Sequence, residues 1–307
     1  MRLLKFLLLI YYMNPRTTQH SITVSIVIPC FNHGQYIQEA LDSIDHQKIN
    51  YNTEIIIVDD GSTDNSTLQK LEELKALNYT VIHQTNGGPG KARNTGIEKA
   101  TGQYILPLDA DNKIHPNYIN KAIPVLEKNS ADIVYAAPVF FGNTTLKKRQ
   151  FKVRPFDDLG LVTGNCADAC AIFKKEVWVK NGGYDDCMPS YGFEDWDFWI
   201  SASKNNFVFH FINEKLYYYR IVEDSMISVF NNKDRNVIIH RYLAKKHSDF
   251  YLEKLVKITY IRERYFYDLL RFPITPIIYL LYWLGILENT TKRAKKKYAH
   301  YEGVKNC

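Results

Sequence analysis

The sequence of 307 residues predicts an α/β fold in which a mainly parallel sheet is flanked by helices. Short β-branched runs alternate with helix-like segments from Ser21 onward, and these runs are apolar almost to their last residues. Strands that are apolar along their whole length are buried on both faces, as in a parallel sheet covered by helices. Apolar residues make up 46% and charged residues 23% of the chain, which are ordinary values for a globular domain.

The first half of the chain supplies the strands and helices of this fold. Strands are predicted at 24–31, 54–60, 80–84 and 104–111. Helices are predicted between and after them at 34–45, 64–77, 90–100 and 116–128. Asp or Pro near several of these starts is a signal for the beginning of a helix. Parallel strands joined by helices form right-handed crossovers, so we expect the strand ends to share one edge of the sheet.

Beyond residue 130 the pattern is less regular. A helix is predicted around 193–204, and two apolar runs follow it at 207–212 and 215–221. The residues after 230 are typical of helices. The sequence therefore predicts an apolar extension at 1–21, an α/β domain at 22–229, and a helical, basic extension at 230–307.

Both ends of the chain carry apolar segments that are too short to span a bilayer as a helix. Residues 3–13 are apolar apart from one lysine and lack a following small-residue cleavage site, so they are either a membrane-interacting segment or a packed extension. Near the other end, the apolar run 276–287 precedes the basic cluster 292–297. An interfacial helix over 272–297 on an anionic membrane surface is favoured over a core helix with a solvated tail.

The net charge of +6 is concentrated in this tail. Residues 241–307 contain 14 Lys or Arg and 6 Asp or Glu, so the rest of the chain has a small excess of acids. A nucleic-acid enzyme would carry its basic surface around the active site, so no nucleic-acid partner is expected. Five cysteines without a C-x-x-C pair indicate neither a zinc site nor a disulfide framework. We expect a cytoplasmic protein, peripheral at the inner face of the cytoplasmic membrane.

Polar clusters follow three of the four predicted strands, at 32–34, 59–62 and 109–111. Ligands of open parallel sheets bind at the carboxyl ends of the strands, so these clusters are expected to converge on one crevice. Asp109 and Asp111 are spaced i, i+2, and paired carboxylates of this kind suit Mg²⁺ or Mn²⁺ shared with substrate phosphates. A turn with an Asp that caps the next helix is the alternative.

Two adjacent carboxylates, Asp59 and Asp60, close the second strand and suit hydrogen bonds to the ring N–H or ribose hydroxyls of a nucleoside. The glycine-rich segment 87–90 opens a helix, where backbone N–H groups favour anions and Lys91 or Arg93 could reach a phosphate. The segment is neither a P-loop nor G-x-G-x-x-G, which disfavours kinases and dinucleotide enzymes. Helix capping and a structural loop are the alternatives for these two segments.

Three acids lie among aromatic residues at 191–199. On a helix, Glu194 and Asp197 share a face, whereas Asp195 projects about 100° away from Glu194. A carboxylate beside aromatic rings tends toward a raised pKa, which suits a general base, although acids at a helix N-terminus also stabilise the helix dipole. His210 and His240 are candidates for the remaining position of a metal.

In this order, the segments VSIVIPCFN, IIIVDDGSTD, GPGKARNTGI, LPLDAD, GGYDD and FEDWDFW closely resemble the family-2 inverting glycosyltransferases of the GT-A fold. The resemblance covers roughly residues 22–225 and implies a Rossmann-like, mixed and mainly parallel sheet. It does not cover the first twenty residues or the basic tail.

The resemblance implies that Asp60 faces the uracil of a nucleotide donor, with Asp59 behind it. Asp109 would lie near the ribose or a metal-bound water, and Asp111 would bind the metal directly. Asp195 would be the general base that deprotonates the acceptor hydroxyl. The donor nucleotide would also be bordered by Pro29, Phe31, Asn32 and Arg93, with Lys91 as a further neighbour. Acceptor or lid positions would be Asn165, Asp168, Glu194, Trp196 and Arg220, with 222–228 as the lid itself.

These residues together predict a glycosyltransferase that depends on a divalent metal, Mn²⁺ or Mg²⁺. It would move a hexosyl or N-acetylhexosaminyl group from a nucleotide sugar, with a UDP-sugar favoured, to a hydroxyl of a glycan or lipid-linked acceptor. Surface polysaccharide and lipopolysaccharide synthesis are the expected settings. The alternative is a catalytically inert sugar-nucleotide or glycan-binding protein on the same fold. A nucleotidyltransferase is disfavoured because VSIVIPCFN lacks a glycine-rich basic signature.

Overall fold

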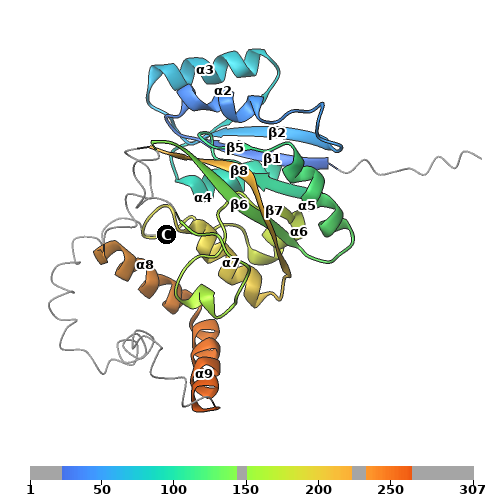
Figure 1. Cartoon of the computed structure of the whole chain (residues 1–307). Helices are drawn as coiled ribbons and strands as arrows, with labels where there is room; N and C mark the ends of the chain where they lie inside the picture. Colours follow the sequence, from blue (N-terminus) through green and yellow to red (C-terminus); the bar gives the residue numbers. More distant parts are fainter. Residues whose placement is uncertain (1–22, 144–150, 223–232, 265–307) are drawn as a thin grey trace, which may run out of the picture.

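The computed structural model describes residues 23–143, 151–222 and 233–264 (Figure 1). Over these residues one eight-stranded sheet has the strand order β3-β2-β1-β4-β7-β6-β8-β5. The pairs β1·β2, β1·β4, β2·β3 and β6·β8 are parallel, and β4·β7, β6·β7 and β5·β8 are antiparallel. The expectation of a mixed, mainly parallel sheet flanked by helices is confirmed.

The first four predicted strands and helices are all present, with bounds that differ from the predicted ones by one to four residues. The strands are β1 (Thr23–Cys30), β2 (Asn52–Asp59), β3 (Thr80–His83) and β4 (Tyr104–Pro107). The helices are α2 (Gly34–Asp42), α3 (Asn65–Ala76), α4 (Pro89–Lys99) and α5 (Asn117–Glu127).

The prediction of one strand over 104–111 is wrong in its second half, because pairing of β4 with β1 ends at Pro107. The chain then turns, with the backbone N–H of Asn112 donating to the carbonyl of Asp109 at 2.9 Å. Asp109 and Asp111 therefore lie on a turn just beyond the strand. The short strand β5 (Lys113–Ile114) follows this turn and pairs with the last part of β8.

Alternation along β1 explains why both faces of the sheet are covered. Val24, Ile26 and Ile28 point into one core, which α2, α3 and α5 complete, whereas Val27 points into the other core with α4. Figure 1 shows α2 and α3 on one side of the sheet and α4 and α7 on the other. A strand with full burial on both faces explains the nearly continuous apolar run in the sequence.

The second half of the sheet differs most from the sequence prediction. The segment 131–142, which gave no clear pattern, forms the ten-residue strand β6 (Ile133–Gly142). The two apolar runs at 207–212 and 215–221 form one strand, β8 (Phe209–Ile221), whose pairing with β6 shifts register at Ala136–Pro138. Between them lie a 3-10 turn (Gly160–Val162), β7 (Ile172–Lys174), α6 (Lys175–Asn181) and α7 (Glu194–Lys204).

Two further helices follow, α8 (Lys233–Lys246) and α9 (Ser248–Arg264). The side chains of Ile239 and Leu243 on α8 and of Phe250 on α9 join the core that contains α4 and α7. Within the described residues, no helix combines the length and the apolar character needed to cross a membrane. The predicted segments 3–13, 223–228, 276–287 and 292–297 lie outside the described residues.

Candidate active site

The acids at the end of β2 are buried and already hydrogen-bonded. Asp60 is 3% exposed, and its two carboxylate oxygens accept the backbone N–H groups of Gly87 and Gly88, each at 2.8 Å. Asp59 is also 3% exposed and accepts the backbone N–H of Ser62 at 2.9 Å, with His83 at 3.0 Å from its other oxygen. Both carboxylates therefore hold the loops that follow β2 and β3.

The hydrogen bonds from Gly87 and Gly88 to Asp60 fix the backbone of the glycine-rich segment. Gly88 has a φ of 88°, a backbone conformation that side chains other than glycine rarely adopt. A Cβ added at Gly88 would lie 2.2 Å from the ring of Tyr191, so the ring packs directly on the backbone there. Pro89 is the first residue of α4, where its missing N–H and fixed φ suit a helix start. Lys91 on this first turn is exposed.

The predicted nucleoside-bordering residues lie at the end of β1. Pro29 is in the strand and pairs with Val58 of β2, and Phe31 follows it with 44% of its surface exposed. Asn32 has a positive φ of 55°, and its side-chain oxygen accepts the backbone N–H of Thr63 at 2.8 Å. The end of β1 is thus tied to the loop after β2, which leaves the Phe31 ring facing solvent.

Arg93 and Asp109 form an ion pair, with 2.7 Å between Nη2 and Oδ1. Arg93 is only 4% exposed, lies over the ring of Tyr184 at 5.6 Å, and its Nε has no hydrogen-bond partner among the described residues. The structure thus brings these two predicted site residues together. Since the guanidinium is desolvated, the first acid of the Asp109–Asp111 pair is held in place by a buried charge.

Asp109 belongs to a cluster of carboxylates whose other members are hard to ionise. Burial, and then the charge of Asp109, raises the pKa of Asp111 to about 7. The same two causes raise the pKa of Asp168 to about 7. Burial and the charge of Asp168 raise the pKa of Asp195 well above its usual range, and Arg93 opposes this shift. The four acids come from the turn after β4, the loop before β7 and the first turn of α7, so the fold gathers them from distant parts of the chain.

The side chain of Asp195 is fixed in orientation. Its Oδ2 accepts the side-chain amide of Asn165 at 2.8 Å, and its Oδ1 accepts the backbone N–H of Trp196 at 2.8 Å. The indole of Trp196 in turn donates to the carbonyl of Leu161 at 2.9 Å. The structure therefore joins Asn165, Asp195 and Trp196, three of the residues that the sequence picked out separately.

Arg220 is a fixed part of the turn that carries the two acids. Its Nε donates to the carbonyl of Asp111 at 2.9 Å, and its backbone N–H donates to the side chain of Asn112 at 2.9 Å. The guanidinium also pairs with Glu39 at 2.9 Å and lies over the ring of Phe141 at 4.3 Å. The lid predicted after Arg220 lies almost wholly outside the described residues and stays a prediction.

A divalent cation fits the chemistry of this acid cluster. Asp111, Asp168 and Asp195 are pushed toward their neutral forms first by burial and then by the negative charge of neighbouring carboxylates, and a bound cation would stabilise their charged forms. Oxygen ligands of this type suit Mg²⁺ and Mn²⁺, which retain water and share their coordination with phosphates. Asp109 and Asp111 are the carboxylates best placed by sequence spacing to hold it.

Neither candidate histidine adds a metal ligand among the described residues. His210 is exposed and lies ten residues before Arg220 on β8. His240 packs edge-on against the ring of Trp196, with 4.9 Å between the centroids. The one described group of three metal-binding side chains within 4.8 Å is Asp185, Asp186 and Cys187, where Asp185 already pairs with Lys246.

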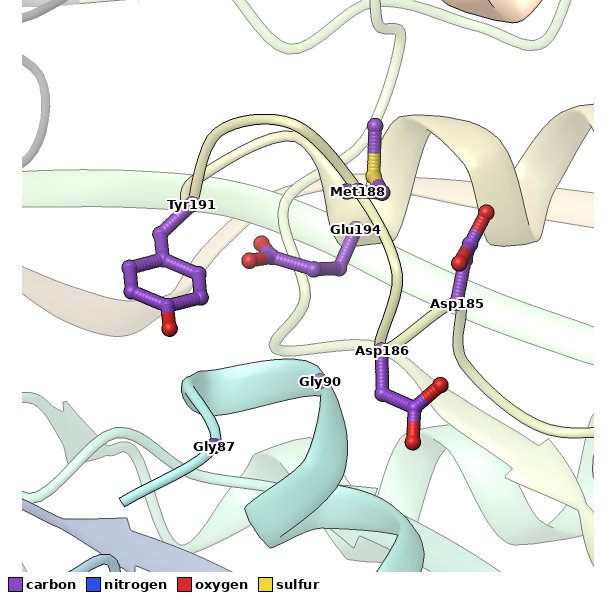
Figure 2. A pocket seen from close by; sticks show the side chains of 7 residues that line it. All are labelled: Gly87, Gly90, Asp185, Asp186, Met188, Tyr191 and Glu194. Atoms are coloured by element: carbon purple, nitrogen blue, oxygen red, sulfur yellow. The ribbon is translucent and has the colours of Figure 1, made fainter. Parts of the chain in front are cut away.

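Glu194, which adjoins Asp195 in the chain and adds to the negative charge around it, lines a narrow recess beside the glycine-rich segment. Figure 2 shows its carboxylate between Tyr191 and the start of α4, with Asp185 and Asp186 on the other side of the recess. Its Oε2 accepts the backbone N–H of Gly192 at 2.9 Å, and its Oε1 is buried without a partner among the described residues. Burial raises the pKa of Glu194, and the charge of Arg93 opposes this.

The comparisons with known proteins agree with this architecture. The family description "Glycosyl transferase family 2" matches residues 25–180, which is half of the chain. This chain belongs to glycosyl transferase family 2. The matched range includes Asp59, Asp60, Arg93, Asp109 and Asp111 and ends before Asp195.

The chain is similar to bacterial proteins that are named as glycosyltransferases or as a teichoic acid biosynthesis protein. The chain is 38% identical over 113 residues to the glycosyltransferase GlyG of Streptococcus pneumoniae, covering 36% of this chain and 37% of that protein. It is 29% identical over 211 residues to the minor teichoic acid biosynthesis protein GgaB of Bacillus subtilis, covering 65% and 23%. The chain thus matches about a third or less of the length of these relatives.

Solved structures share the fold at low identity. TarS of Staphylococcus aureus in complex with UDP-GlcNAc has a TM-score of 0.53 and 24% identity, covering 67% of this chain and 61% of that one. The mannosyltransferase PcManGT of Pyrobaculum calidifontis, in complex with GDP-Man and Mn²⁺, has a TM-score of 0.56 and 15% identity, covering 91% and 84%. The expected GT-A fold is confirmed.

Proposed function

We propose that this chain is an inverting, metal-dependent glycosyltransferase that uses a nucleotide sugar, with a UDP-sugar as the favoured donor. The observation that carries the proposal is the acid cluster, in which Asp195 is oriented by Asn165 and shares its electrostatic environment with Asp168. Asp109 and Asp111 belong to the same cluster through Asp168. This site would therefore combine two carboxylates that can bind a metal, Asp109 and Asp111, with a third carboxylate, Asp195, that can accept a proton.

The donor would bind along the carboxyl ends of β1, β2 and β4. Pro29, Phe31 and Asn32 would border the nucleoside with Asp59 and Asp60, and the exposed ring of Phe31 offers a face for a base. Asp109, held by Arg93, would lie near the ribose. Asp111 would bind the metal, with Asp109 beside it.

Charge governs the chemical step. The leaving group of a sugar nucleotide is a diphosphate, which gains negative charge as the glycosidic bond breaks, and the bound metal ion supplies positive charge there. Arg93 adds a fixed positive charge next to Asp109. A cation held by Asp109 and Asp111 would also lower the pKa of the neighbouring acids and so favour the ionised form of Asp195.

Asp195 then acts on the acceptor. It takes the proton of the acceptor hydroxyl while that oxygen forms a bond to the anomeric carbon and the bond from that carbon to the diphosphate breaks. Attack from the face opposite the leaving group inverts the anomeric centre. Asn165 and the backbone N–H of Trp196 keep the carboxylate aimed during this step.

The acceptor proposed is a hydroxyl of a glycan or a lipid-linked precursor in surface polysaccharide, lipopolysaccharide or related glycan synthesis. The similarity to GgaB supports this class, since that protein is named for teichoic acid biosynthesis. The basic, apolar segment 272–297 would hold the enzyme at an anionic membrane surface, where such acceptors are found.

A panel of UDP- and GDP-sugars tests the proposal. We expect the full chain to release the nucleoside diphosphate from one of these donors in the presence of Mn²⁺ or Mg²⁺ and to stop when EDTA is added. A hexose and an N-acetylhexosamine donor of each nucleotide identify the sugar class at the same time. Binding of a donor with no hydrolysis or transfer under any condition would instead indicate a catalytically inert sugar-nucleotide-binding protein.

A further inference from the structure

Helix α8 belongs to the segment 230–307, which the sequence predicted as a separate extension. In the structure this helix contacts the candidate active site. Its residues reach two segments of the α/β domain, the first turns of α7 and the loop 185–192. Neither contact was indicated by a motif. Asp195 lies in the first turn of the same helix α7.

Asp197 is the α7 residue that α8 holds. Its side chain is 2% exposed, and its Oδ1 lies 2.7 Å from Nε2 of His247, which is 4% exposed. Its Oδ2 lies 2.8 Å from Nζ of Lys246. A buried carboxylate needs such partners, because without them its desolvation is not compensated. Both oxygens of Asp197 are thus fixed, one by Lys246, the last residue of α8, and one by His247, which directly follows that helix.

Lys246 also holds the loop before α7. The same Nζ lies 2.6 Å from Oδ2 of Asp185, whose side chain is 8% exposed. The hydroxyl of Tyr242, one turn earlier on α8, donates to that oxygen at 2.7 Å. One ammonium group therefore bridges two buried carboxylates, one on α7 and one on the loop.

The bridged loop lies directly on the glycine-rich segment of the donor side. A Cβ added at Gly90 would lie 3.1 Å from the carbonyl oxygen of Asp185, and Tyr191 packs on Gly88. Figure 2 shows this loop arching over the start of α4. Gly87 and Gly88 in turn donate to Asp60. The contacts of α8 thus reach from the start of α7 to the donor loop.

Asp195 lies two residues before Asp197 on the first turn of α7. Trp196 between them is held on one side by the Leu161 carbonyl and on the other by the ring of His240 from α8. The direction in which Asp195 points depends on the rotation and tilt of this turn. A displacement of about 1 Å in a reacting group lowers a rate by about 10²-fold.

We propose that Lys246 and His247 are positioning residues for Asp195, acting through Asp197 and Asp185. The proposal rests on the proposed function for its kinetic consequence. Lys246 keeps 36% of its side chain exposed, but Asp197 and Asp185 are only 2% and 8% exposed, so loss of the ammonium also lowers stability. The effect that distinguishes a positioning role is a change in the placement of α7 relative to the donor loop.

The test uses the full chain with four single substitutions. Lys246→Met removes the bridge and keeps the aliphatic stem, and Lys245→Met is the matched control at the exposed neighbouring lysine. His247→Leu removes the donor to Asp197, and His247→Gln keeps a side-chain N–H donor at a similar reach. For each variant we would measure kcat and the donor KM, the melting temperature, and amide hydrogen exchange in 185–200.

We expect Lys246→Met to lower kcat about tenfold or more with a donor KM within twofold of the unmodified protein, while Lys245→Met changes neither. His247→Gln should recover most of the kcat that His247→Leu loses. Exchange in 185–200 should rise in Lys246→Met and His247→Leu only. If His247→Leu does not fold, the kcat and hydrogen exchange of Lys246→Met and His247→Gln still test whether these residues position Asp195.

Equal kcat values for Lys246→Met and Lys245→Met would overturn the proposal, as would unchanged hydrogen exchange in 185–200. The exchange measurement needs no substrate. If the unmodified chain transfers no sugar, the proposed function fails, and exchange alone then decides whether α8 fixes this segment.

Discussion

The acids of the donor side and those of the candidate catalytic cluster have opposite surroundings. Asp60 accepts two backbone N–H groups and the side-chain amide of Gln84, all from within the fold. Burial and neighbouring negative charge raise the pKa of both Asp195 and Asp168. The acids of the donor side are thus stabilised by hydrogen-bond donors of the protein, whereas the acids of the cluster would be stabilised further by added positive charge.

This difference arises because the loops beside the two groups of acids offer different numbers of backbone N–H donors. The loops after β2 and β3 supply free N–H groups from glycines and from a helix start, and these groups satisfy Asp59 and Asp60. The turn after β4 and the first turn of α7 bring carboxylates together with few such donors. The comparison predicts that replacing Asp by Asn lowers stability on the donor side and lowers activity in the cluster.

The largest effect is expected for Asp195→Asn. The amide cannot accept the acceptor proton, so transfer should fall by about 10³-fold or more, while the melting temperature stays level or rises because a crowded charge is removed. Donor binding, measured by calorimetry, should match the unmodified chain. Transfer at more than a tenth of the normal rate would contradict the assignment of Asp195 as the base.

Asp111→Asn should come next, with a loss of about 10²-fold in metal-dependent donor hydrolysis. The substitution removes a charged oxygen ligand, so the concentration of Mn²⁺ needed for half-maximal rate should also rise. A titration of the rate with Mn²⁺ measures both quantities. An unchanged Mn²⁺ requirement would place the metal elsewhere.

On the donor side, Asp60→Asn should mainly affect folding. The new side-chain N–H₂ would face a backbone N–H of the glycine-rich segment, which leaves a buried donor unsatisfied and costs about 2 kcal/mol of the free energy of unfolding. Urea denaturation measures this loss. Asp42→Asn, at an exposed acid on α2, is the control and should change stability by less than about 0.5 kcal/mol. Equal stability of the two variants would contradict the structural role of Asp60.

The smallest effect concerns Asp168 and pH. Its folded pKa of about 7 lies above the unfolded value of 3.8, so the stability that it contributes is present below pH 4 and is lost as the pH rises to 7. In EDTA, Asp168→Asn should therefore melt a few degrees above the unmodified chain at pH 8, and the two curves should converge near pH 4. Asn keeps the oxygen that accepts the Cys170 N–H. A variant that melts lower at pH 8 would contradict the crowding of charge in this cluster.

Features that depend on one short segment of the chain could be predicted from the sequence. Apolar runs gave β1 to β4, and the side chain of Asp64 caps α3 by accepting the Thr67 N–H at 2.7 Å, as its position before the helix indicates. Asp109 and Asp111 stand out for the same reason, since their spacing and their place after a strand are both local.

Contacts between distant segments could not be predicted in this way. No motif marks Asp168 in NCADAC as part of the acid cluster, because its neighbours come from β4 and α7. The pairing of Lys246 with Asp185 and Asp197 spans more than forty residues. Strand β6 was missed because its residues show no regular alternation, and its register is set by pairing with β8, which has extra residues opposite Ala136–Pro138.

The most direct test of the acid cluster is a calorimetric titration of UDP into the full chain, with and without Mn²⁺. Because the four carboxylates of the cluster outnumber the two cations beside them, Arg93 and Arg220, the account predicts measurable UDP binding in the presence of Mn²⁺ and a loss of at least tenfold in affinity in EDTA. It also predicts that Asp111→Asn removes most of this difference. UDP affinity that is the same with Mn²⁺ and with EDTA would contradict the central claim that the cluster is completed by a divalent cation and a nucleoside diphosphate.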